Sequence, residues 1–221
     1  MSEPTAIAQF WLNWGVQLAV AVATLAAVIV ALFGQAFRSK YFPPQLRLGI
    51  AAPTGEKTKV TLRWVEGDAE HQRLEDARYY RIQVTNARRW SPANQVHVAL
   101  LQIEEPSADG QFAVSWAGDV PLVWMHQPIL PVLRTIGPVA QADLCSVVKG
   151  KWFQLHPLVP PSNIEVTRRG QTRMLLSVQA RSNEADSPVL RVALSWDGQW
   201  HDGALEMQTH LAVKVLDAPV A

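Results

Sequence analysis

The sequence predicts a single N-terminal transmembrane α-helix followed by an all-β, immunoglobulin-like antiparallel sandwich. Three observations lead to this fold class: an uncharged apolar segment near the N-terminus, a change of pattern at Pro43 and Pro44, and many short alternating runs after it. We expect a short tail at residues 1–10, a transmembrane helix at 11–37, a juxtamembrane linker at 38–45 and a soluble β-sandwich domain at 46–221.

The apolar segment is long enough to cross a lipid bilayer. No charged side chain occurs from Pro4 to Phe37, and Trp11–Phe33 contains only three polar residues. A helix of these residues would be roughly 34 Å long, against about 30 Å for the hydrocarbon core of a membrane. Tryptophans at one end and aromatic residues near the other are typical of the two membrane interfaces.

The charges around this segment predict its orientation. Arg38, Lys40 and Arg47 follow it, whereas only Glu3 precedes it. By the positive-inside rule the basic end stays inside, so we expect a signal anchor in the plasma (inner) membrane, with the N-terminus outside and the β domain in the cytoplasm. The rival interpretation is a cleavable signal peptide with small residues at Gly34 and Ala36, but such peptides begin with basic residues.

A stripe of small residues runs along the predicted helix. The residues recur every four positions, at Gly15, Ala19, Ala23, Ala27 and Ala31. Small side chains let two helix backbones approach closely in lipid. The stripe is therefore a candidate interface for a homo-oligomer, although the general abundance of small residues in this segment would also explain it.

The region after the two prolines is rich in β-strand patterns. Val60–Trp64, Tyr80–Val84 and Val96–Leu100 alternate apolar and polar residues, which predicts strands with one buried face. Further strands are expected at Phe112–Trp116, Leu144–Val148, Met174–Ala180, Val189–Trp196 and Met207–Val215. With no convincing amphipathic helix between them, these eight strands favour an antiparallel sandwich or barrel.

Two of these strands resemble part of an immunoglobulin-like sandwich. Tyr79–Asn86, a polar loop and Gln95–Glu104 look like its paired central strands. The resemblance is one of architecture and implies no activity, and the paired cysteines of antibody domains are absent. The lone Cys145 lies in an apolar run and is expected in the core.

Several function classes lack their usual signals. No phosphate-binding loop, hydrolase elbow, Cys-x-x-Cys pair or zinc-protease motif occurs, and the six histidines are scattered. The balance of 20 basic and 19 acidic residues, without a basic stripe, argues against nucleic-acid binding. We therefore expect no cofactor, no metal and no enzymatic activity, with a hydrolase or metal enzyme ranked last.

Two groups of residues are candidate binding sites. Arg88, Arg89 and Trp90 lie in a loop between two regular strands, and tryptophan and arginine often anchor protein interfaces. The second group, Trp196 and Trp200, flanks a run with two carboxylates and a histidine. That run could hold a ligand, but Asp197–Gly198 is also a favoured hairpin turn across which the tryptophans would pack. A tryptophan folded back over the end of the sandwich is the alternative for Trp90.

From these observations we expect a membrane-tethered module that holds a protein partner of unknown identity at the cytoplasmic face. The alternative is an exported, envelope-facing domain whose exposed tryptophans bind a ligand or a glycan. The two functions require opposite orientations of the β domain, and the charge pattern favours the cytoplasmic orientation that the first one needs.

Overall fold

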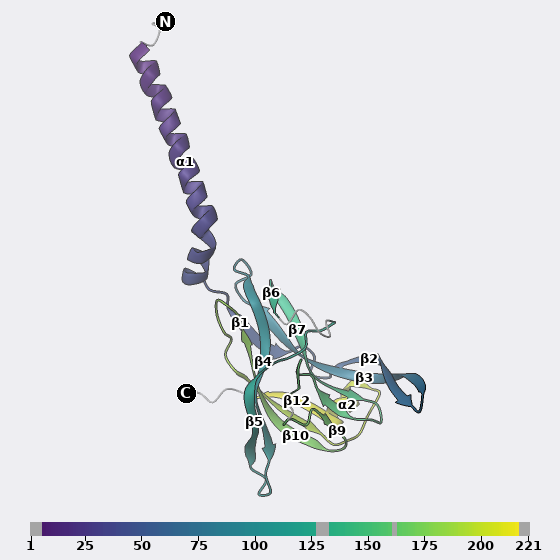
Figure 1. Ribbon diagram of the computed structural model, residues 1–221. Coiled ribbons are helices and arrows are strands. Elements are labelled where there is room, and N and C mark those ends of the chain that lie inside the picture. Colours follow the sequence, from purple (N-terminus) through teal and green to yellow (C-terminus); the bar gives the residue numbers. More distant parts are fainter. Residues whose placement is uncertain (1–5, 127–132, 161–162, 217–221) are drawn as a thin grey trace. The chain divides into compact units, whose positions relative to one another are not determined.

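The computed structural model describes residues 6–126, 133–160 and 163–216, and its chain forms two compact units, Met1–Pro43 and Pro44–Ala221 (Figure 1). The first unit is the helix α1 (Ala6–Tyr41), of which Asn13–Ala31 is long and apolar enough to cross a membrane. The helix starts earlier and ends later than the predicted 11–37. Pro43 and Pro44 follow its end after one residue, as expected for residues that cannot continue a helix.

The second unit is an all-β domain with two antiparallel sheets of six strands each. The first sheet contains, in hydrogen-bonded order, β1 (Leu46–Ile50), β3 (Ala69–Asn86), β7 (Val139–Val148), β8 (Phe153–Leu155) and β9 (Thr167–Arg168), and β2 (Glu56–Glu66) pairs with β3. Because β3 has 18 residues, β1 and β2 pair with successive parts of it.

The second sheet lies in the order β12 (Leu211–Leu216), β11 (Leu190–Trp196), β10 (Thr172–Arg181), β4 (Ala93–Pro106) and β5 (Phe112–Pro121), with β6 (Arg134–Ile136) paired to β4. The short helix α2 (Ala204–His210) connects β11 to β12. Among the described strands neither sheet closes into a barrel.

One hydrophobic core receives side chains from both sheets. Tyr80, Ile82 and Val84 of β3 and the alternating apolar residues of β4 are fully buried in it, so the inward-facing pattern predicted for these two strands is confirmed. Cys145 also lies in this core, where burial raises the pKa of its thiol and keeps it protonated.

Two predicted features of the sheets are different in the structure. Tyr79–Asn86 and Gln95–Glu104 were expected to pair, but β3 and β4 belong to opposite sheets and pair with β7 and β10 instead. The predicted strand Met207–Val215 begins only at Leu211, because Ala204–His210 forms α2. This segment is rich in good helix formers, and Met207 is buried from the helix.

The alternation in Val60–Trp64 also has a different meaning from the predicted one. β2 is a strand, but Val60 and Leu62 are only half-buried and Trp64 is exposed. The reason is that β2 and the first half of β3 run on as a two-stranded ribbon beyond the sheet (Figure 1). No second sheet covers that ribbon among the described residues.

Candidate functional site

The predicted loop with Arg88, Arg89 and Trp90 is a turn organised by the buried side chain of Asn86. The Asn86 Oδ1 accepts hydrogen bonds from the backbone N–H of Gln45 at 3.1 Å and of Arg88 at 3.0 Å. Its Nδ2 donates to the carbonyl oxygen of Ser91 at 2.7 Å. One amide group therefore fixes both ends of the turn and joins it to the start of β1.

The turn places Arg89 and Trp90 at its two central positions. It is closed by a hydrogen bond from the N–H of Ser91 to the carbonyl oxygen of Arg88 at 2.9 Å. Trp90 is 56% exposed, Arg89 is exposed and Arg88 is half-buried. The turn thus presents a large aromatic ring to the surface on a support with little conformational freedom, and the ring is not folded back over the end of the sandwich. Binding of a partner by these three residues stays a prediction.

The second predicted pair is not presented in the same way. Trp196 is 4% exposed, packs 6.3 Å from the ring of Phe153 and donates its Nε1–H to the carbonyl oxygen of Gln199 at 2.9 Å. It is a core residue with a satisfied polar group. Trp200 is half-buried, and the guanidinium of Arg78 lies 6.0 Å from its ring centroid.

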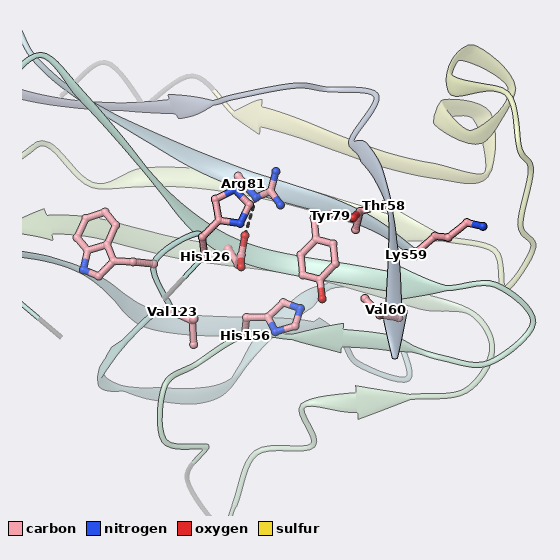
Figure 2. A pocket seen from close by; sticks show the side chains of 10 residues that line it. Thr58, Lys59, Val60, Tyr79, Arg81, Val123, His126 and His156 are labelled. Carbon is pink, nitrogen blue, oxygen red and sulfur yellow. Dashed lines mark hydrogen bonds and ion pairs between the residues drawn. The ribbon is translucent and has the colours of Figure 1, made fainter. Parts of the chain in front are cut away.

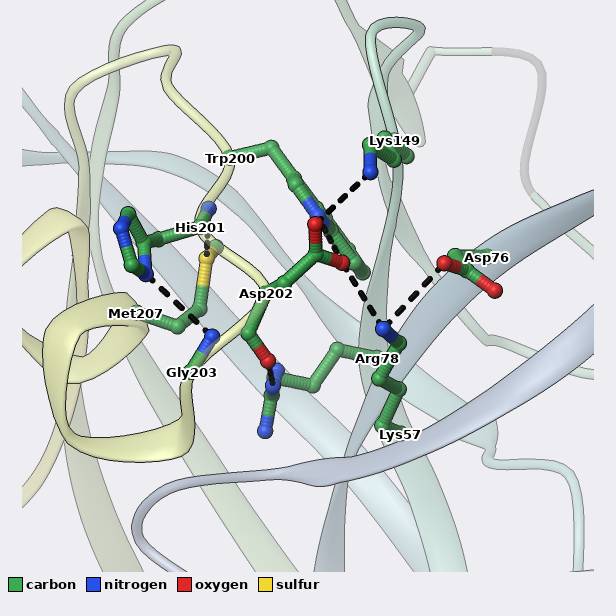
Figure 3. Close-up of polar contacts among 9 residues, drawn as sticks. All are labelled: Lys57, Asp76, Arg78, Lys149, Trp200, His201, Asp202, Gly203 and Met207. Carbon is green, nitrogen blue, oxygen red and sulfur yellow. Dashed lines mark hydrogen bonds and ion pairs between the residues drawn. The ribbon is translucent and has the colours of Figure 1, made fainter.

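Asp202, in the same run, is the centre of a polar cluster between segments distant in sequence (Figure 3). Its carboxylate accepts from Lys57 Nζ at 2.7 Å and from Lys149 Nζ at 2.8 Å. Three hydrogen bonds hold the pKa of Asp202 well below its usual range. The largest effect comes from Lys149, followed by Lys57 and then the indole N–H of Trp200. The Asp202 carbonyl oxygen also accepts from Arg78. These contacts join the β11–β12 connection to the first sheet, which is a structural role.

A cleft of about 390 Å³ opens beside β2, β3 and β7 (Figure 2). Its polar wall includes Arg81 and Asp143, whose Nε and Oδ1 atoms are 2.7 Å apart, and Arg81 also pairs with Glu56. The Arg81 guanidinium lies 5.3 Å from the ring centroid of Tyr79. Tyr79 in turn stacks on His156 at 5.3 Å, and Figure 2 shows these two rings next to each other.

His156 is held as a neutral imidazole in this cleft. Its Nε2 is 2.8 Å from the hydroxyl oxygen of Ser146, and burial lowers the pKa of the ring. The serine and histidine are arranged as in a hydrolytic pair, but Ser146 is buried and does not line the cleft. A substrate in the cleft would therefore meet the rings of Tyr79 and His156 and not the hydroxyl, so the arrangement is suited to binding a small polar molecule.

The sequence contains one signal for this cleft. Asp143 is the one charged residue of the otherwise uncharged strand β7, and Arg81 stands at a polar position of the alternating segment of β3. Charged side chains within buried strands are usually paired, so Asp143 predicts a basic partner elsewhere in the chain. Their separation of 62 residues prevents a local motif from revealing the pair.

The ribbon formed by β2 and β3 carries a further apolar surface. We call the segment from Thr61 to Leu74, whose ends are cross-strand partners, the arm. On one face Trp64, 43% exposed, stacks on His71 with ring centroids 5.5 Å apart; on the other face Val65 and Leu74 are 70% and 64% exposed. The two strands are joined by a two-residue turn in which Gly67 has a φ of 63°, a conformation that favours glycine.

The small residues of the helix lie where the sequence placed them. Gly15, Ala19, Ala23, Ala27 and Ala31 are all within α1, on one face because of their four-residue spacing, and exposed in the single chain. The association of two such helices stays a prediction.

In residues 6–126, 133–160 and 163–216 no group of three or more His, Cys, Asp or Glu side chains is arranged to hold a metal ion. No protein family, characterised protein or solved structure matches this chain.

Proposed function

We propose that this chain is a single-pass membrane-anchored interaction module. In this proposal α1 crosses the plasma membrane, the β domain faces the cytoplasm, and the arm binds a protein partner. The observation that carries the proposal is the exposure of Trp64, Val65 and Leu74 on the arm. These side chains lie on both faces of the arm, and exposed apolar surface on a projecting element is typical of an interaction site.

The pairing of the arm supports the same function. In the described part of the chain β2 pairs only with β3, and the register of β3 with β7 starts at Ala77, so both edges of the arm are open. Open edges can accept a strand from another protein through backbone hydrogen bonds. A two-stranded hairpin is marginally stable on its own, and a bound partner would therefore stabilise the arm as well.

The energy available from these side chains is sufficient for specific binding. Complete burial of an exposed valine or leucine contributes roughly 1.5–3 kcal/mol each, and an interface tryptophan often contributes about 2 kcal/mol or more. The half-buried Leu62 lies on the same face as Trp64 and would extend the apolar contact. The charged residues around this group would form the polar rim of the interface.

Membrane anchoring and orientation are proposed from the apolar span and its flanking charges. Arg38, Lys40 and Arg47 follow the span and only Glu3 precedes it, which favours a cytoplasmic β domain. The small-residue stripe supports association of two anchors. We also propose that the domain is an immunoglobulin-like sandwich, because two six-stranded antiparallel sheets share one core.

The arm can be tested with a matched pair of variants of the full chain. In membranes from cells that express it, Trp64→Ser combined with Leu74→Ser should reduce co-purification of a specific partner by at least about thirty-fold, the equivalent of 2 kcal/mol. The control is Val114→Ser, which changes an equally exposed side chain on β5, outside the arm. Equal partner recovery by both variants would contradict the role of the arm.

Orientation has a separate test. Protease added to intact cells should leave the β domain undigested if it faces the cytoplasm, and should digest it after the cells are opened. Digestion in intact cells would place the domain outside and favour the second candidate function.

That second candidate is the binding of a small polar ligand in the cleft beside Tyr79 and His156. It is favoured by the volume of the cleft and by the neutral imidazole, which can both donate and accept hydrogen bonds. A ligand of this kind should raise the melting temperature of the wild-type protein but not that of His156→Leu. A ligand that stabilises both proteins equally binds elsewhere.

A further inference from the structure

We propose that the Arg88–Ser91 turn is a lipid-binding element, in which Trp90 enters the headgroup region of the bilayer and Arg88 and Arg89 bind the phosphates of anionic lipids. The inference depends on the proposed membrane span but not on the arm or its partner. It assigns the turn to the membrane and not to the protein partner expected from the sequence.

The first step is the connection between the turn and the start of the β domain. The N–H of Gln45 donates to Asn86 Oδ1 at 3.1 Å, and the N–H of Ala87 donates to the carbonyl oxygen of Gln45 at 2.9 Å. The turn is thus tied to Gln45 by two hydrogen bonds. Gln45 is only four residues beyond Tyr41, the last residue of α1, and four residues reach at most about 14 Å.

The second step is the level at which the span leaves the hydrocarbon core. The sequence from Pro4 to Phe37 has no charged residue, and Arg38 and Lys40 are the first charges after it. Such residues lie in the headgroup region at the end of a membrane helix. Tyr41 comes next after Lys40. Gln45, to which the turn is hydrogen-bonded, is therefore held within reach of the membrane surface by the length of the chain alone.

The third step is the chemistry of the turn. Tryptophan is enriched at membrane interfaces, because its ring is apolar and its N–H is polar, and Trp90 is 56% exposed. Arginine binds phosphate through paired N–H donors. Because Asn86 already fixes the turn, little conformational entropy is lost when the turn binds the membrane surface.

The charges in this part of the chain favour an anionic surface. Segment 38–47 and the turn together contain five basic residues: Arg38, Lys40, Arg47, Arg88 and Arg89. The neighbouring loop contributes Glu184 and Asp186, and the carboxylate of Glu184 already accepts two hydrogen bonds from Asn94. Each basic residue close to an anionic membrane contributes roughly five-fold to the affinity.

Tethering decides between a lipid surface and a protein partner at this turn. The anchor keeps the turn at a high effective concentration relative to lipid, so even weak contacts populate the bound state. A protein partner at the same turn would have to compete with lipid held at that effective concentration. The membrane is therefore the occupant that the chain itself supplies.

The experiment uses the full chain in phosphatidylcholine vesicles that contain phosphatidylglycerol and lipids brominated on their acyl chains, which quench nearby tryptophans. The quenched fraction of the emission is compared for wild type, Trp90→Phe and the matched control Trp64→Phe, whose tryptophan lies on the arm. Trp90→Phe should lower the quenched fraction, because it removes a lipid-contacting ring. Trp64→Phe should raise it, because it removes a ring in water.

A second variant tests the phosphate contacts. Arg88→Gln combined with Arg89→Gln should lower the ratio of docked to undocked turns roughly thirty-fold, which reduces quenching of Trp90. High salt should act in the same direction. Unchanged quenching in this variant would overturn the role of the two arginines.

The outcomes separate this inference from the proposed anchor. Trp11 and Trp14 lie within or beside the span and report insertion of α1. If they are quenched and Trp90→Phe behaves like Trp64→Phe, the turn faces water and the lipid-binding inference is wrong. A protein partner would then be the favoured occupant of the turn. If Trp11 and Trp14 are not quenched, the membrane anchor itself is wrong and this inference is overturned with it.

Discussion

Replacing Asp143 with alanine should destabilise the β domain by about 3 kcal/mol. The side chains of Arg81 and Asp143 are 8% and 12% exposed, and their Nε and Oδ1 atoms are 2.7 Å apart. Removing one partner of a buried ion pair costs roughly 3–5 kcal/mol, because the other charge stays buried without its counter-ion. We expect the lower end of this range, since Arg81 keeps Glu56 and the face of Tyr79.

The control variants define what this loss should be compared with. Glu56→Gln changes a carboxylate that is 64% exposed and should cost less than about 1 kcal/mol. The double variant Arg81→Leu with Asp143→Leu removes both charges and should lose less stability than Asp143→Ala alone, because no buried charge is left without a partner.

The measurement is urea or thermal unfolding of residues 44–221, a compact unit with its own core that we expect to fold without the helix. A far-ultraviolet circular dichroism spectrum dominated by helix would show that this fragment does not fold as described. A loss of about 3 kcal/mol should lower the melting temperature by roughly 6–12 °C in a domain of this size. If Asp143→Ala loses no more than Glu56→Gln, the pair is not desolvated and the reasoning is refuted.

Three further predictions follow from the burial of single residues and from the helix. Trp196→Ala should cost about 3–5 kcal/mol and Trp90→Ala about 0.5 kcal/mol in the same unfolding assay, and equal losses would contradict the different burial of the two rings. The folded-state pKa of His156 is below the value of about 6.5 in the unfolded chain, so stability should be constant above that value and fall as the pH drops through it. His156→Gln should flatten this fall, and an identical pH profile for the variant would exclude the imidazole as its source. Ala23→Leu or Ala27→Leu should weaken self-association of the helix in a membrane reporter assay while insertion is retained, and unchanged association would rule out the stripe as an interface.

Local patterns in the sequence predicted most of the long strands but not what covers them. The alternation in Tyr80–Val84 and in Val60–Trp64 is the same, and both segments are strands. The first is buried in the core, whereas the second lies partly on the open arm. Period-two alternation shows which residues share a face, but not whether another sheet covers that face.

The same limit applies to the candidate sites. Trp90 lies in a turn and Trp196 directly precedes one, yet Trp90 is exposed and Trp196 lies in the core. The turn at Arg88–Ser91 was predicted because its flanking strands are regular. The Asp202 cluster was not predicted, because Lys57 and Asp202 are 145 residues apart and come together only where the first sheet contacts the β11–β12 connection.

Four features were predictable from the amino-acid sequence alone: the apolar helix, the break at Pro43 and Pro44, the all-β character of the remainder and the buried cysteine. These features depend on properties of neighbouring residues: hydropathy, alternation and proline geometry. Three other features required the three-dimensional structure: β3 and β4 lie in opposite sheets, Arg81 pairs with Asp143, and the arm is uncovered. Those features arise from contacts between residues far apart in the chain, and many such pairings are compatible with the same local pattern of alternating apolar side chains.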